Sequence, residues 1–146
     1  MATCIRQATA NDFDDVYRFL CELQQRQFDA TVLRELYLKN IANPNNIYLV
    51  ACEGNTIIGY ISCHLQTLLH HAGKVAEVQE MYLISEKRSR GIGKLMMNEV
   101  KALARSKGAV QLEVTTRAIR EKAIHFYERE AFENSHKKLV HYFHKP

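Results

Sequence analysis

The chain has 146 residues, of which 47% are hydrophobic and 25% charged, which is typical of one compact globular domain. We therefore expect a single domain over residues 1–146. No stretch reaches the roughly 20 apolar residues of a membrane span, and residues 1–10 lack the pattern of a signal peptide. A cytoplasmic location without a membrane partner is expected. The net charge of +4 favours anionic ligands mildly and is too small to indicate nucleic acid.

The cysteines predict free thiols, because no CxxC pair occurs among Cys4, Cys21, Cys52 and Cys63. If Gly54 and Asn55 form a two-residue hairpin turn, Cys52 lies opposite Ile57. Cys63 then lies about six residues, or roughly 20 Å, further along the same hairpin. This separation excludes a disulfide within the hairpin.

The N-terminal part of the chain predicts a short strand over 4–7 followed by two helices. Asn11 is expected to cap the first helix, whose apolar side chains recur at helical spacing through Leu23. Asp29 or Thr31 begins the second helix, which ends before a proline. We expect both helices to bury one apolar face.

The rest of the chain predicts an antiparallel meander, a crossover and a final helix and strand. β-Branched and aromatic residues mark the strands, and period-3.6 patterns mark the helices. The predicted elements are strands 47–52, 56–66 and 74–84, helix 91–107, strand 110–116, helix 121–130 and strand 138–143. This order predicts one α/β sandwich without repeats or linkers, with a strand–helix–strand crossover at 75–116.

The junction between the third strand of the meander and the next helix carries the sequence Arg-Ser-Arg-Gly-Ile-Gly-Lys over 88–94. Glycines allow the backbone to approach phosphate oxygens, and free N–H groups at a helix start converge on them. The spacing does not fit a nucleotide P-loop or a dinucleotide fingerprint. The alternative is that both glycines only serve the turn.

Three segments in sequence order resemble the GCN5-related N-acetyltransferases (GNAT). Arg88, Gly91 and Gly93 match the acyl-CoA signature of that family, the strand 77–84 resembles its fourth strand, and 123–132 resembles its last helix and turn. The resemblance implies the GNAT acyl-CoA N-acyltransferase fold, a mixed central sheet flanked by helices, with acetyl-CoA as cosubstrate. It assigns cofactor contacts to Met81, Tyr82, Leu83, Arg88, Ser89, Arg90, Gly91, Ile92, Gly93 and Lys94.

Further segments resemble the aminoalkylphosphonate N-acetyltransferases within that family. They are Phe28-Asp29, Asn43-Pro-Asn45, His64-Leu-Gln66, His70-His71, 77–80 and Ser135-His136. The resemblance implies transfer of acetyl from acetyl-CoA to the primary amine of a small aminoalkylphosphonate, by direct attack in a ternary complex.

The resemblance also implies the catalytic roles. An ammonium must lose a proton before its nitrogen attacks, and Glu77 is favoured as base, with Glu80 as a supporting or metal-side carboxylate. In a regular strand the two carboxylates fall on opposite faces, unless a bulge re-aims one. The alternative is an ordinary solvent-facing acid. The N–H groups of Met81 and Leu83 could hold the thioester oxygen.

Tyr127 is favoured as the acid that protonates the leaving thiolate, and core packing is its alternative role. Two positions depart from the family pattern. Ala131 replaces a glycine, so a left-handed backbone there would be mildly strained. Arg120 replaces an asparagine, which concerns how the pantetheine arm is held.

A divalent metal is a further cofactor option, since His64, His70 and His71 with Glu77 offer suitable ligand types. Their spacing matches no recognised metal motif, and surface or hydrogen-bonded histidines are the alternative. A metal bridged by the phosphonate itself is equally compatible. The oligomeric state is open, with a homodimer as one option.

Other functions remain as alternatives. The acceptor could be a polyamine, an aminoglycoside or a protein amine, and the chain could be a non-catalytic CoA-sensing module. A nucleic-acid binder is disfavoured because no extended basic patch occurs. A cysteine acyl-enzyme is disfavoured because Cys52 and Cys63 lack a nearby base.

Overall fold

A computed structural model describes residues 2–146 of the chain. The chain divides into two compact units, one ending at Val114 and the other spanning Thr115–Pro146. In residues 2–146, no helix combines the length and the apolar character needed to cross a membrane.

Over the described residues 2–114, the first unit contains five strands, three α-helices and three short 3₁₀ turns. Its elements are β1 (Thr3–Gln7), η1 (Ala10–Asp12), α1 (Phe13–Gln24), α2 (Ala30–Ile41), β2 (Asn46–Glu53), β3 (Thr56–Leu68), η2 (Leu69–His71), β4 (Gly73–Leu83), η3 (Ser85–Lys87), α3 (Ile92–Ser106) and β5 (Ala109–Val114). These bounds confirm the predicted order, with element ends that move by up to two residues.

The five strands form one sheet in the order β1-β2-β3-β4-β5. All neighbours are antiparallel except β4 and β5, which are parallel and joined by α3. This confirms the predicted meander and crossover. Cys52 pairs with Ile57 as the hairpin turn predicted, and all four cysteines are free.

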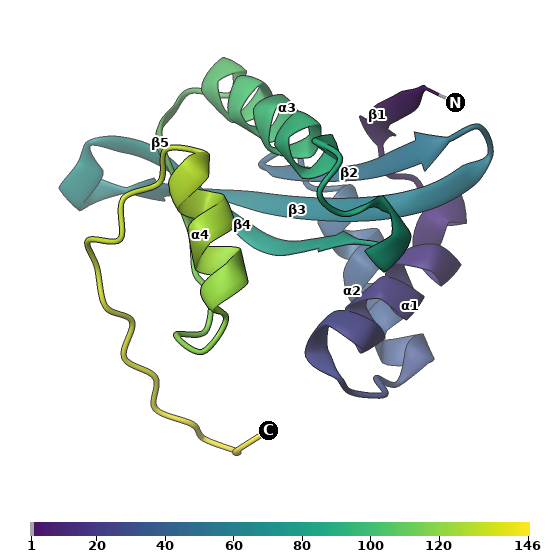
Figure 1. Cartoon of the computed structure of the whole chain (residues 1–146). Coiled ribbons are helices and arrows are strands. Elements are labelled where there is room, and N and C mark those ends of the chain that lie inside the picture. Colours follow the sequence, from purple (N-terminus) through teal and green to yellow (C-terminus); the bar gives the residue numbers. More distant parts are fainter. Residues whose placement is uncertain (1) are drawn as a thin grey trace. The chain divides into compact units, whose positions relative to one another are not determined.

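Helices cover both faces of the sheet: α1 and α2 lie on one face and α3 on the other (Figure 1). Tyr48, Tyr60 and Tyr82 come from three neighbouring strands and are buried with Phe13 and Phe19 of α1. The Phe19 and Tyr82 rings stack with centroids 4.9 Å apart. Aromatic packing therefore fixes α1 against β2, β3 and β4.

The start of α1 corrects the prediction that Asn11 caps it. A 3₁₀ turn precedes the helix, and its capping interaction comes from Asp12, whose Oδ2 accepts from the Thr9 N–H at 2.8 Å. The Arg6 guanidinium donates to both carboxylate oxygens of Asp12, each at 2.8 Å. Asp12 is thus held as a buried anion, while Asn11 is exposed. At α2 the structure decides between the two predicted starts, Asp29 and Thr31, because Asp29 accepts from the Val32 N–H and caps the helix.

The second unit contains α4 (Glu121–Arg129) and an extended C-terminal segment. Ala131 has a positive φ of 70°, as the expected left-handed turn requires. The predicted strand over 138–143 is wrong: in the described residues no strand pairing includes it, and Leu139 and Phe143 are about nine-tenths exposed. Its apolar residues do not alternate with polar ones, so they define no single buried face.

Candidate active site

A β-bulge in β4 sets the direction of the two predicted catalytic carboxylates. In the pairing of β3 with β4, His64 lies opposite Glu77 and Ser62 lies opposite Glu80, so three steps along β4 match two along β3. Gln79 is the extra residue. The bulge shifts the alternation of side chains by one residue. Glu77 and Glu80 therefore share one face of the sheet, the face of their partners His64 and Ser62. The sequence left this outcome open, because residues 77 and 80 fall on opposite faces of a regular strand unless a bulge lies between them.

The same face carries further polar groups, which can be identified only from the pairing between neighbouring strands. Glu77 pairs with Glu113 of β5 across the parallel ladder, and Tyr48 of β2 pairs with Ser62. The polar groups continue the face on which the aromatic cluster packs against α1 and α2. Sequence reasoning missed Glu113 and Tyr48 because their neighbours lie on other strands.

Glu80 is held by two hydroxyl groups from β3. Tyr60 Oη donates to Glu80 Oε1 at 3.1 Å, and Ser62 Oγ donates to the same oxygen. The Glu80 N–H in turn donates to Ser62 Oγ at 3.2 Å. Burial, and then the charge of Glu80, raise the pKa of Tyr60 well above its usual value, so the hydroxyl remains a donor. Glu80 therefore has a fixed orientation.

His64 is held from the opposite side. Tyr48 Oη lies 2.7 Å from His64 Nε2, and Asn40 Nδ2 of α2 donates to the same Tyr48 oxygen at 2.8 Å. Burial lowers the pKa of His64, while the negative charges of Glu80 and Glu77 oppose this effect. Burial also raises the pKa of Tyr48 to about 12. His64 is therefore neutral at pH 7, next to acidic side chains.

The glycine-containing loop follows β4 directly and ends at the first turn of α3. Arg88 Nε donates to the Leu83 carbonyl at 2.8 Å, which ties the loop to the end of β4. Ser89 and Gly91 both have positive φ, 62° and 83°. The first backbone bond of α3 runs from the Leu95 N–H to the Gly91 carbonyl. The N–H groups of 92–94 thus lie at the positive end of the helix, where an anion is stabilised.

β4 extends past its neighbour toward this loop. Its pairing with β5 ends at Val78 and Val114, while β4 itself runs to Leu83. The Tyr82 side chain is buried in the aromatic cluster, and the Arg88 guanidinium lies 5.5 Å from its ring centroid. Of Tyr82, only the backbone is therefore left for contact with a ligand.

The sequence pattern of the Acetyltransferase (GNAT) family matches residues 14–132. The chain belongs to this family. It is therefore an acetyl-CoA-dependent N-acetyltransferase of the GNAT type, as the three sequence motifs predicted.

Relatives of this GNAT enzyme agree in sequence and in fold. The aminoalkylphosphonate N-acetyltransferase of Salmonella typhimurium is 35% identical over 93% of this chain and 89% of its own. A crystal structure described as a transcriptional regulator from Bacillus halodurans has a TM-score of 0.88 at 24% identity, covering 97% of this chain and 100% of that one. A GNAT family acetyltransferase of Staphylococcus aureus has a TM-score of 0.77 at 14% identity, with 98% and 100% covered. The two structures show the shared fold.

The remaining residue that sequence predicted for GNAT catalysis, Tyr127, lies on α4 in the second unit. Its ring contacts those of Phe126 and Phe132, with centroids 5.3 and 5.7 Å away. Burial raises the pKa of Tyr127, and the charge of Arg120 lowers it. The hydroxyl is therefore protonated at neutral pH, as an acid must be.

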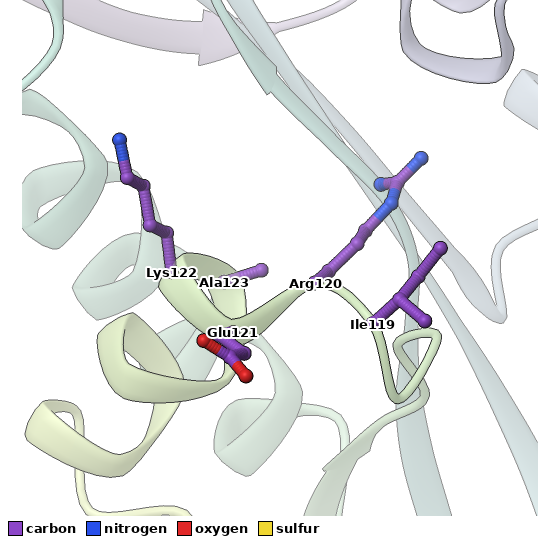
Figure 2. Close-up of a pocket in the computed structure, with 5 residues that line it drawn as sticks. All are labelled: Ile119, Arg120, Glu121, Lys122 and Ala123. Atoms are coloured by element: carbon purple, nitrogen blue, oxygen red, sulfur yellow. The ribbon is translucent and has the colours of Figure 1, made fainter.

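The start of α4 lines an open depression of about 470 Å³. Figure 2 shows the side chains of Arg120 and Lys122 extending in different directions, with Glu121 turned away from both. The two cations therefore do not converge on one point. Among residues 2–146, no group of three His, Cys, Asp or Glu side chains is placed to hold a metal ion.

Proposed function

We propose that this enzyme transfers the acetyl group of acetyl-CoA to the primary amine of a small aminoalkylphosphonate. The observation that carries the proposal is the 35% identity with the Salmonella enzyme across nearly the full length of both chains. We also infer that residues 1–146 act as one acetyltransferase domain, because the family match over 14–132 crosses the boundary between the two units.

Glu77 is the proposed general base. The substrate amine arrives as an ammonium, which the carboxylates on the β4 face attract. Glu80 already accepts from Tyr60 and Ser62, so its part is to hold charge beside the reacting amine. Glu77 takes the proton, directly or through water. The nitrogen then attacks the thioester carbon, forming the C–N bond as the C–S bond breaks.

Tyr127 is the proposed acid by resemblance to the family. Departure of the CoA thiolate leaves a negative charge on sulfur, and the Tyr127 hydroxyl supplies the proton that neutralises it. Its raised pKa keeps this proton in place until the sulfur departs. The Tyr127→Phe variant should lose roughly 10²–10⁴ in kcat and keep its affinity for CoA.

The pyrophosphate of acetyl-CoA is proposed to lie over the backbone from Arg90 to Lys94. The positive φ of Gly91 and the start of α3 support this placement. The N–H groups of Met81 and Leu83 are the proposed partners of the thioester oxygen. They belong to the part of β4 that runs beyond its pairing with β5.

A polyamine is the competing acceptor, and one observation favours it. Glu113 joins Glu77 and Glu80 on the same face, which adds a carboxylate to the two expected from sequence. Several ammonium groups would need such partners when they leave water. An aminoalkylphosphonate needs carboxylates for its single ammonium and a separate partner for its anionic group.

Thiol release from acetyl-CoA, measured with aminoethylphosphonate and with spermidine at equal pH, tests the acceptor. Each amine is assayed with a divalent ion and then with a chelator, which also tests the divalent metal that sequence left as an option. We expect a higher kcat/KM for aminoethylphosphonate. A higher value for spermidine in both conditions would reject the phosphonate assignment and retain the acetyltransferase.

The base is tested by Glu77→Gln, which should lower turnover by roughly 10²–10⁴ while CoA binding stays intact. The loss should shrink at high pH, where free amine is abundant. Glu99→Gln, an exposed acid on α3, is the matched control. If Glu77→Gln kept wild-type turnover across neutral pH, Glu77 would not be the general base, and Glu80 would be the next residue to test.

A further inference from the structure

Glu53 and Lys87 form an ion pair between the end of β2 and the end of η3, the turn that leads into the glycine-containing segment 88–94 (the donor loop). Lys87 Nζ lies 2.6 Å from Glu53 Oε1, and the two side chains are 27% and 18% exposed. An ion pair on an open surface is weak, because solvent and salt screen it. The partial burial of this pair reduces that screening.

Hydrogen bonds fix the same turn to the strands beside it. The Ile84 N–H donates to the Ile58 carbonyl of β3 at 2.9 Å, and the Lys87 N–H donates to the Ile84 carbonyl at 3.0 Å. Arg88 Nε donates to the Leu83 carbonyl at 2.8 Å. These bonds connect η3 to β3 and β4. The ion pair adds a connection to β2, at the residue from which the chain enters the donor loop.

The donor loop and the residue before it carry several cationic side chains, on Lys87, Arg88, Arg90 and Lys94. Like charges in such a short segment repel one another, which favours an open loop. The Lys87 ammonium, and to a smaller extent the Arg90 guanidinium, hold the pKa of Glu53 below its usual value. The Glu53 carboxylate is therefore ionised at neutral pH, and its negative charge opposes the repulsion within the loop.

We propose that Glu53 and Lys87 are positioning residues, whose ion pair holds the donor loop in the shape that receives the pyrophosphate of acetyl-CoA. This inference rests on the proposed placement of the pyrophosphate over the backbone from Arg90 to Lys94. A loop that is already ordered loses less conformational freedom when its ligand binds, so affinity rises without a new contact. The pair acts through the loop, and neither side chain needs to touch CoA.

Charge alone would give these two residues a different role, and the two roles predict different outcomes. CoA is anionic, so Glu53 would repel it and Lys87 would attract it. Glu53→Gln would then tighten CoA binding and Lys87→Gln would weaken it. The double variant would stay near wild type, because its net charge is unchanged. If the pair positions the loop, all three variants bind CoA more weakly.

Isothermal titration calorimetry with CoA, at about 0.15 M salt, distinguishes the two roles. We expect the Kd for CoA to rise roughly two- to fivefold in the double variant, which corresponds to the loss of one ion pair. Each single variant should also show a rise. The rise in the double variant should be smaller than the product of the two, because either change already breaks the pair. Exchange of the two residues, Glu53→Lys with Lys87→Glu, should recover most of the affinity.

Glu53→Asp supplies a variant that keeps the charge. It withdraws the carboxylate from Lys87 by one methylene group, so CoA binding should weaken if the contact matters and stay unchanged if only charge matters. Asp15→Asn is the matched control, because it also removes one carboxylate charge and breaks an exposed ion pair on α1, in which Arg18 Nη2 lies 2.9 Å from Asp15 Oδ1. Its Kd for CoA should equal that of wild type.

Steady-state kinetics gives a readout that a loss of folded protein would not reproduce. With saturating amine, KM for acetyl-CoA in the double variant should rise by about the same factor as Kd, while kcat stays within about twofold of wild type. A smaller folded fraction would instead lower the apparent kcat and leave KM unchanged.

Wild-type affinity for CoA in the double variant or in Glu53→Asp, or opposite changes in the two single variants, would overturn the proposal. Gly91→Ala separates this failure from a failure of the proposed CoA site. If Gly91→Ala bound CoA as tightly as wild type, the placement of the pyrophosphate over the donor loop would be rejected, whatever the ion-pair variants show.

Discussion

The hydroxyl of Ser62 should contribute an unusually large share of the stability of β4. Ser62 is fully buried, donates to Glu80 Oε1 and accepts from the Glu80 N–H at 3.2 Å. Ser62→Ala removes both bonds at once. A hydrogen bond to a charged group contributes about 1.5–3 kcal/mol, and Tyr60 still donates to the carboxylate in the variant. We therefore expect a loss of about 2 kcal/mol in the free energy of unfolding.

Urea and thermal unfolding measure this loss. Two kcal/mol corresponds to a fall in Tm of roughly 4–8 °C for a chain of this size. A double-mutant cycle of Ser62→Ala with Glu80→Ala should give a coupling of about 1–2 kcal/mol, since each change removes the partner of the other. Ser106→Ala is the control: its exposed hydroxyl donates to the Leu103 carbonyl at 2.7 Å, and its loss should cost under about 0.5 kcal/mol.

Two outcomes would refute this reasoning. A coupling below about 0.5 kcal/mol would mean that Ser62 and Glu80 contribute independently, so the hydroxyl does not hold the carboxylate. If Ser106→Ala lost as much free energy of unfolding as Ser62→Ala, burial would not increase the contribution of the Ser62 hydroxyl to stability.

Further predictions concern the backbone and one partly exposed ion pair. Gly91→Ala and Gly108→Ala should each cost about 1–2 kcal/mol, because both residues have positive φ. An added Cβ would meet no atom within 4 Å at either site, so backbone strain alone sets this cost. Calorimetry should show weaker CoA binding only for Gly91→Ala. Ala131→Gly should stabilise the chain by about 0.5–1 kcal/mol in thermal unfolding, since φ is 70° there; a lower Tm would contradict this. Arg6 holds the pKa of Asp12 below its usual 3.8, so the pair stabilises the fold above about pH 4 and this contribution disappears as the pH falls through the lowered pKa. Arg6→Met should thus cost about 1–2 kcal/mol at pH 7, a range reduced for the partly exposed guanidinium, and less at pH 3; an equal cost at both would refute the linkage.

Local patterns predicted most of the fold because they are read over a few residues. The turn at Gly54 set the hairpin register, so Cys52 was placed opposite Ile57 correctly. The start of α2 was predicted at Asp29 or Thr31, and Asp29 is the residue that caps it. The prediction of a strand over 138–143 was wrong because local composition carries no information on pairing. Apolar and aromatic content suggests a strand, but a strand also requires a neighbouring strand to pair with.

The site was less predictable, because its geometry depends on register between strands. Glu77 and Glu80 were named from the resemblance, yet their common face follows from the bulge at Gln79, which nothing in the local sequence marks. Glu113 and Tyr48 became visible only once β5 and β2 were placed beside β4 and β3. The sequence motifs predicted an acetyltransferase, whereas the pairing of the strands determines which polar side chains lie on one face.

The extra residue at Gln79 couples the length of β4 to the direction of its side chains. Glu77 lies before it, and Glu80 and the stretch that leads to the loop at Gly91 lie after it. One residue of strand rises about 3.3 Å. Deleting this exposed residue would bring Glu77 closer to the loop by about that step and would turn Glu77 and Glu80 to opposite faces of the sheet. One residue of β4 thus sets both the distance from Glu77 to the loop and the common facing of the two carboxylates, so neither can change without the other.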